Sequence, residues 1–113
     1  MNSSQTDLAR FIVDAHQGKQ PKPIADEGLN LTEAYEVQSE VVKQLGGNVV
    51  GFKSALSSKA AQSSFSMSEP VFGALLSHAR IASGFDLAEM VTPMIEIEMG
   101  FEVGASLTSS MSA

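Results

Sequence analysis

The segment from Met94 to Val103 alternates apolar and acidic side chains with a period of two residues. Successive side chains of a β-strand point to opposite faces, so this period predicts a strand with one apolar and one acidic face. A strand also needs a neighbour for its backbone hydrogen bonds, so the chain is predicted to contain a sheet. The apolar face would carry Ile95, Ile97, Met99, Phe101 and Val103. The other face would carry Glu96, Glu98 and Glu102.

The first half of the chain has helical periodicity instead. Leu8, Phe11, Ile12 and Ala15 follow the i, i+3, i+4, i+7 spacing of an amphipathic helix. Ser4, with Asp7 three residues later, resembles a capping box, so this helix is predicted to run from about residue 4 toward Gly18. The two prolines of residues 18–23 predict an extended linker after it.

A second helix is predicted to begin near Asn30 or Thr32, with Asn30 and Glu33 as its capping box. Gly46-Gly47 would end it. The apolar stripe of this helix is Ala34, Val37, Val41 and Leu45.

The later part of the chain is predicted to contain short strands. Residues 48–53 and 70–76 indicate extended segments, and residues 80–84 indicate another strand. Between the first two, Ser57 or Ser58 is predicted to cap a short helix that ends near Phe65. Helices followed by a mostly antiparallel β portion predict the α+β class. The predicted organisation is one domain over residues 1–107, with a Ser-rich disordered tail at 108–113.

The charge balance and the lack of cysteine exclude several classes of protein. Thirteen acidic residues against seven basic ones give the 113-residue chain a net charge of −6. A chain with so few cations is not expected to bind nucleic acid or an anionic membrane surface. With no cysteine it has neither disulfides nor thiolate chemistry. The polar N-terminus does not resemble a secretory signal, which predicts a cytoplasmic protein.

Glu96 and Glu98 are the first candidate site. Their Cα atoms would lie about 6.6–6.8 Å apart on one face of a strand, a spacing at which two carboxylates can converge on a hard divalent cation. The pattern alone favours the alternative, in which both glutamates face water from a half-buried antiparallel strand.

Lys53, at the end of a predicted strand, is the second candidate. It could bind a substrate carboxylate or donate a proton, and the alternative is a solvated strand end. His16 and His78 lack a partner at a helical metal-ligand spacing, so both are predicted to be structural or exposed.

Four blocks in fixed order carry a resemblance to a known family. They are residues 29–38 (LNLTEAYEVQ), 50–62 (VGFKSALSSKAAQ), 69–76 (EPVFGALL) and 95–104 (IEIEMGFEVG). Together they resemble the 2-keto-4-pentenoate hydratase and 4-oxalocrotonate decarboxylase branch of the fumarylacetoacetate hydrolase superfamily, over about residues 8–107. Because these enzymes are more than twice as long, the chain looks like a version truncated to the N-terminal part, with an incomplete fumarylacetoacetate hydrolase-type fold.

The resemblance implies a lyase-like protein that acts on a small 2-oxo acid with Mg²⁺ or Mn²⁺. Glu96 and Glu98 match two of the three metal carboxylates of the family. Lys53 matches the lysine near the substrate, and Ser54 and Leu56 belong to the same substrate-binding turn.

Three departures from the family pattern predict weak metal binding and weak or absent turnover. The third metal carboxylate has no counterpart in this chain, and Val71 stands where the family has a proton-transferring aspartate. Ala55 replaces a glycine, so the turn is expected to differ there, because alanine takes a positive φ less easily. The alternative to a lyase-like protein is a non-catalytic binding or assembly module. In either case, unpaired strand edges predict a homo-oligomer, because such edges can pair with a second copy of the chain.

Overall fold

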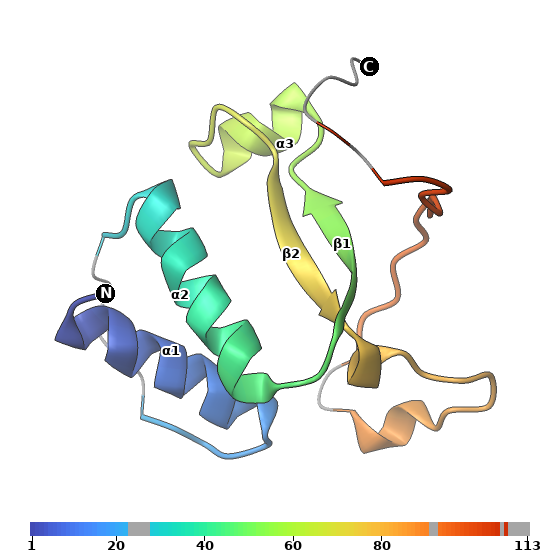
Figure 1. Cartoon of the computed structure of the whole chain (residues 1–113), viewed down its shortest axis with the longest axis horizontal. Coiled ribbons are helices and arrows are strands. Elements are labelled where there is room, and N and C mark those ends of the chain that lie inside the picture. The colour runs from blue at the N-terminus through green and yellow to red at the C-terminus, as the bar shows by residue number, and fades with distance from the viewer. Residues whose placement is uncertain (23–27, 91–92, 107, 109–113) are drawn as a thin grey trace. The chain divides into compact units, whose positions relative to one another are not determined.

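The computed structural model describes residues 1–22, 28–90, 93–106 and 108. It divides into two units, Met1–Ala82 and Ser83–Ala113, which are described separately. The first unit contains two long helices followed by a two-stranded antiparallel sheet, which confirms the α+β class (Figure 1). No helix in the described part of the chain is long and apolar enough to cross a membrane.

Helix α1 spans Ser3–His16. Its capping box is formed by Asn2 and Gln5: the Asn2 side chain accepts from the Gln5 backbone N–H at 2.9 Å, and the Gln5 side chain accepts from the Asn2 N–H at 2.7 Å. The prediction of Ser4 and Asp7 as the box was therefore wrong. Asn is as good an N-cap as Ser, and Gln5 reaches back as Glu would, so the helix begins one residue earlier.

Helix α2 spans Leu31–Leu45 and matches its prediction closely. Asn30 and Glu33 form the expected capping box, and Gly46 ends the helix with a φ of 71°. A positive φ is readily adopted by glycine, which explains why the helix stops at this residue.

The core of this unit lies between the two helices. Its buried residues are Ala9 and Val13 from α1 and Val37 and Val41 from α2. Of the stripe predicted for α1, Ile12 and Leu8 pack against this core while Ala15 is exposed. The buried face is thus rotated by about one residue from the predicted one, toward Ala9 and Val13.

The sheet consists of β1 (Val49–Ala55) and β2 (Val71–Leu76), with α3 (Lys59–Ser64) in the connection between them. The strands are antiparallel, and the register shifts between Val49 and Gly51. Both strands and the short helix occur where the sequence predicted them, and Ser58 caps α3 through its side chain. Helix α2 and strand β2 are in contact (Figure 1).

The strand predicted at residues 80–84 is absent. A short 3₁₀ turn, Ser77–Ala79, follows β2, and a turn at residues 83 and 84 places Gly84 at a φ of 89°. This turn interrupts the extended backbone that a strand would need.

In the second unit, the described residues include a 3₁₀ turn, Leu87–Glu89, and no strand. The strand predicted over Met94–Val103 is therefore not formed in the structure. Alternation specifies which side chains share a face, but a strand forms only when a neighbour accepts and donates its backbone hydrogen bonds. Most of the predicted tail, at 109–113, lies outside the described residues.

Candidate functional site

Lys53 and Ser54 lie in β1, where the cross-strand partner of Lys53 is Gly73 and that of Ser54 is Phe72. The Lys53 side chain is half-buried and Ser54 is exposed. Glycine has no side chain, so the residue opposite Lys53 contributes only its backbone at this point of the strand pair.

Leu56 follows the last residue of β1 with a φ of 56°. Ala55, for which an altered backbone was expected, is not among the described non-glycine residues with positive φ. The left-handed conformation falls at Leu56, one position after Ala55. It ends the strand and turns the chain toward α3.

Gln62 of α3 fixes this turn. Its side-chain amide donates to the main-chain carbonyl of Leu56 at 2.9 Å, and its side-chain oxygen accepts from the Lys59 ammonium at 3.1 Å. Gln62 is 4% exposed, so both groups of its amide are satisfied inside the protein. No sequence pattern predicted this role for Gln62, because a glutamine in a helix is usually solvated.

Two side chains of α2 hold the backbone of Phe72 in β2. The Phe72 N–H donates to the Tyr35 hydroxyl at 3.3 Å, and the Phe72 carbonyl accepts from the Gln38 amide at 3.1 Å. The Tyr35 and Phe72 rings also stack, with centroids 4.7 Å apart. Because Phe72 faces Ser54 across the strand pair, these contacts fix the position of β1 relative to α2.

Val71, which the sequence resemblance matches with an aspartate, is half-buried at the start of β2 and pairs with Ala55. Its side chain has no group that exchanges a proton. Proton transfer from this position is therefore excluded by the chemistry of the residue.

Glu96 and Glu98 lie in the second unit, and both are exposed. These two carboxylates, with one residue between them, are oxygen donors of the kind that Mg²⁺ and Mn²⁺ accept, so the donor chemistry fits. Among the described residues there is no group of three or more metal-ligating side chains. The pair would thus supply only part of a coordination shell, with water or ligand oxygens as the remainder.

The structure keeps Lys53, Ser54 and Leu56 together on one continuous strand and turn, as the sequence order requires. The carboxylate pair belongs to a separate unit. The predicted site residues therefore form two groups, a lysine-bearing strand end and an acidic extended segment.

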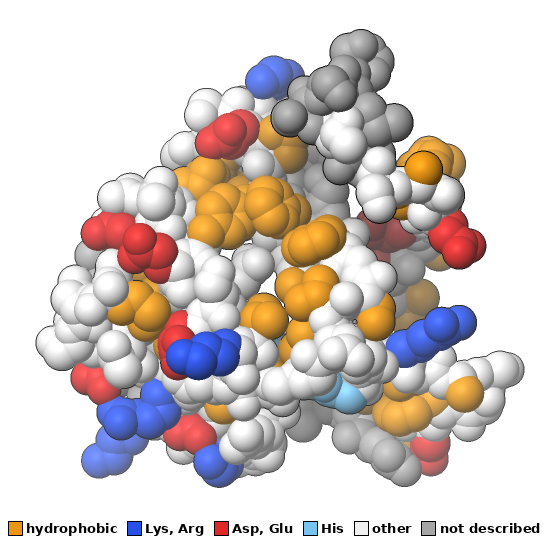
Figure 2. Space-filling model, in the orientation of Figure 1, with side chains coloured by type: hydrophobic (Ala, Val, Ile, Leu, Met, Phe, Trp, Pro, Cys, Tyr) orange, Lys and Arg blue, Asp and Glu red, His pale blue; other side chains and the backbone are white. Residues whose placement is uncertain are grey.

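Hydrophobic side chains are exposed on the face drawn in Figure 2. In the sheet, those that are at least half exposed are Val50, Phe52 and Phe72. In the second unit the predicted apolar row is exposed along its whole length, and Ile97 reaches 99%. Exposed apolar surface of this extent favours interaction with another surface.

Sequence comparison finds relatives that are named as hydratases. The chain is 36% identical over 84 residues to the 2-oxo-hept-4-ene-1,7-dioate hydratase of Escherichia coli, covering 70% of this chain and 32% of that protein. It is 34% identical over 109 residues to the 2-keto-4-pentenoate hydratase of Paraburkholderia xenovorans (strain LB400), covering 89% and 40%. A 2-keto-4-pentenoate hydratase of Burkholderia vietnamiensis is 30% identical over 115 residues, covering 96% and 44%.

The chain thus spans 32–44% of the length of the curated relatives it matches. No protein-family model and no solved structure matches it.

Proposed function

We propose that this chain belongs to the 2-keto-4-pentenoate hydratase family, with a fumarylacetoacetate hydrolase-type fold, and has hydratase-like chemistry on a 2-oxo acid. The observation that carries the proposal is the sequence identity of 30–36% to proteins named as hydratases. The match that covers 89% of this chain leaves out only a short part at its ends. It therefore extends over both the Lys53 block and the Glu96–Glu98 pair.

In this proposal Glu96 and Glu98 hold Mg²⁺ or Mn²⁺ through carboxylate oxygens. The bound ion supplies Lewis-acid polarisation of a substrate keto oxygen. Two carboxylates so close together repel each other, and a cation between them offsets this repulsion. Binding by only two protein ligands is expected to be weak, and oxalate, with two carboxylates of its own, should strengthen it.

The lysine-bearing strand end would bind the organic part of the substrate. The Lys53 ammonium would pair with the substrate carboxylate or donate a proton, and the Ser54 hydroxyl would donate a hydrogen bond. Leu56 would provide apolar contact at the turn. Because Val71 cannot exchange a proton, turnover is expected to be weak or absent even when ligand is bound.

The test is Mn²⁺ titration of the full chain, followed by paramagnetic broadening of backbone amide resonances, with and without oxalate. We expect broadening centred on Glu96 and Glu98, at lower Mn²⁺ concentration when oxalate is present. Broadening that extends to Lys53 in the oxalate complex would support one combined site. Glu96→Gln and Glu98→Gln should abolish the effect, while Glu102→Gln, an equally exposed glutamate of the same segment, should preserve it.

Uniform broadening that the two variants leave unchanged would contradict metal binding at this pair. Turnover is tested separately by hydration of 2-hydroxypenta-2,4-dienoate with Mn²⁺ present. Specific binding without turnover would assign the site a binding role and reject the enzymatic part of the proposal.

A second candidate is a non-catalytic module that assembles with copies of itself. Its support is the apolar row of residues 95–103, in which each of the five apolar side chains is at least 62% exposed. Light scattering over a range of protein concentrations tests it. A monomer mass at every concentration would reject this candidate, and a stable oligomer without Mn²⁺ binding would favour it over the hydratase proposal.

A further inference from the structure

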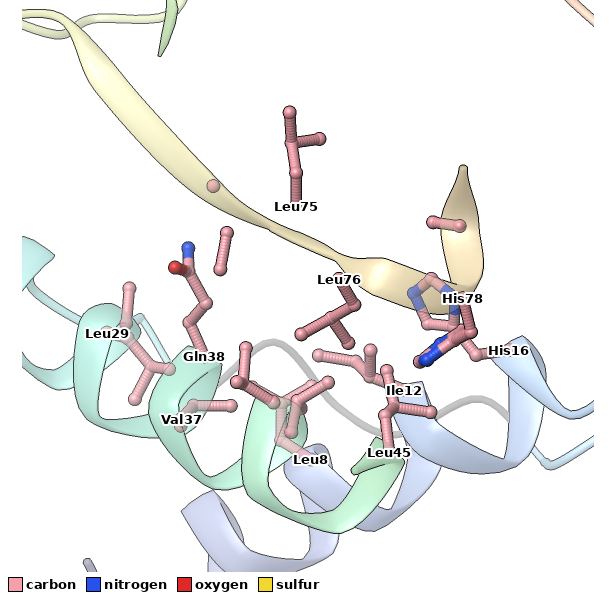
Figure 3. A pocket seen from close by; sticks show the side chains of 16 residues that line it. Leu8, Ile12, His16, Leu29, Val37, Gln38, Leu45, Leu75, Leu76 and His78 are labelled. Carbon is pink, nitrogen blue, oxygen red and sulfur yellow. The ribbon is translucent and has the colours of Figure 1, made fainter. Parts of the chain in front are cut away.

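A pocket of about 450 Å³ lies within the first unit, between α1, α2 and the end of β2 (Figure 3). This volume is within the range of small-molecule sites in proteins. Its walls are mainly aliphatic, with Leu8 and Ile12 from α1, Val41 and Leu45 from α2, and Leu76 from β2. Such walls favour an apolar body for any ligand.

Gln38, a polar residue of the lining whose amide donates to the Phe72 carbonyl, lies toward Leu29, whereas the two imidazole side chains lie at the opposite end of the pocket. Figure 3 shows His16 and His78 at this end, near Leu45, while Leu29 lies at the opposite end. Both histidines are exposed to solvent, so this end is open. A neutral imidazole has one nitrogen that accepts a hydrogen bond, so the two rings can receive a donor group on the ligand.

The electrostatics of the open end favour a positive group there. Helix α1 ends at His16 and helix α2 ends at Leu45, and both residues line the pocket. The C-terminal end of a helix carries a partial negative charge, which attracts cations. No lysine, arginine or carboxylate is among the described residues that line the pocket, and the chain has a net charge of −6. An anionic group would therefore meet an unfavourable potential without a cation to offset it.

We propose that this pocket binds an apolar amine. The hydrocarbon body lies among the aliphatic side chains of α1, α2 and β2, and the ammonium group donates hydrogen bonds to His16 and His78 at the open end. This site is separate from the hydratase proposal, because it uses neither Lys53 nor the carboxylate pair.

The test compares octylamine, octanol and octanoate, which share an alkyl chain and differ in the charge of the head group. Each is titrated below its micellar concentration into the full chain at pH 8, where imidazole is ordinarily neutral. The chain contains only two histidines, so the ring resonances of His16 and His78 are direct NMR reporters of the open end. We expect saturable shifts of both, with octylamine binding at least tenfold more tightly than octanoate.

Two kinds of variant locate the binding. His16→Leu and His78→Leu should each weaken octylamine binding about fivefold while leaving octanol binding nearly unchanged. Ala34→Phe should weaken both ligands at least tenfold, because Ala34 lines the pocket. Ala60→Phe is the matched control, since Ala60 is an exposed helical alanine of α3 outside the pocket.

Tighter binding of octanoate than of octylamine would overturn the choice of an amine. No saturable shift with octylamine or octanol would overturn the pocket itself as a ligand site. Equal effects of Ala34→Phe and Ala60→Phe, with folding confirmed for both by circular dichroism, would place binding elsewhere and reject the proposal.

Discussion

The side-chain amide of Gln62 donates a 2.9 Å hydrogen bond to the main-chain carbonyl of Leu56, the residue at which β1 turns with a φ of 56°. A left-handed conformation costs a leucine roughly 1–2 kcal/mol. The hydrogen bond from a buried amide helps to offset that cost, so the turn after the Lys53 strand is held by a residue six positions along the chain.

We expect Gln62→Ala to lower the free energy of unfolding by about 1–3 kcal/mol. The substitution leaves the Leu56 carbonyl without its donor and the Lys59 ammonium without its acceptor at Gln62. Urea denaturation measures the loss. Gln17→Ala, at an exposed residue after α1, is the control and should change stability by less than about 0.5 kcal/mol. Equal losses for the two variants would show that the Gln62 contacts contribute nothing specific.

Substitution by alanine is expected to destabilise the protein by different amounts at Gly46 and Gly47. Both have positive φ, 88° and 71°, so alanine is strained at either position. A Cβ at Gly47 would lie 3.0 Å from Nδ1 of His78, whereas a Cβ at Gly46 meets nothing within 4 Å. Gly47→Ala should therefore destabilise the protein more than Gly46→Ala, and only Gly47→Ala should shift the His78 ring resonances. A larger loss at Gly46 in thermal unfolding would contradict this close approach.

Asn30→Ala should destabilise the protein by about 1 kcal/mol, because it removes the acceptor for the Glu33 backbone N–H at the start of α2. Asn30→Asp keeps that acceptor and should preserve most of the stability. Thermal unfolding and the far-ultraviolet circular dichroism signal report the change. A loss as large for Asp as for Ala would mean that the side-chain amide, and not the cap oxygen, is the important group.

Glu40 should titrate below the ordinary range of a glutamate. A hydrogen bond from Gln44 lowers the pKa of Glu40 most, and the nearby charge of Lys43 lowers it further, while desolvation acts in the opposite direction. A depressed carboxyl pKa stabilises the fold above the unfolded pKa, and this contribution is lost as the pH falls through the folded pKa. Gln44→Ala should raise the pKa of Glu40, as measured by carboxyl ¹³C titration. An unchanged pKa would reject the Gln44 contact in solution.

The local elements of the first unit were largely predictable from the sequence. The capping box of Asn30 and Glu33, the glycine pair after Leu45 and the Ser58 cap each specify a boundary through contacts within a few residues. The capping box of α1 was predicted at the wrong residues, but Asn2 and Gln5 supply the same capping chemistry as the predicted pair, Ser4 and Asp7.

The candidate site was less predictable. The sequence predicted Lys53, Ser54 and Leu56 as site residues through a family pattern, but the contacts that position β2, the partner strand of β1, are between distant residues. Tyr35 and Gln38 bond to Phe72, which lies 37 and 34 residues further along the chain. No local pattern encodes such a pairing, because it depends on how α2 packs against β2.

Residues 94–103 are a case in which a clear local pattern predicted a strand that the structure does not form. Their alternation determines which side chains share a face, since side-chain direction in an extended chain is a local property. Strand formation also needs a partner for the backbone groups, and the described structure pairs β1 only with β2. Most helix boundaries, the turn positions and the α+β class could be predicted from the sequence, because they depend on short-range sterics and hydrogen bonds. The core between α1 and α2, the burial of Gln62 and the pocket beside His16 could not, because each requires surfaces that meet only after the chain has folded.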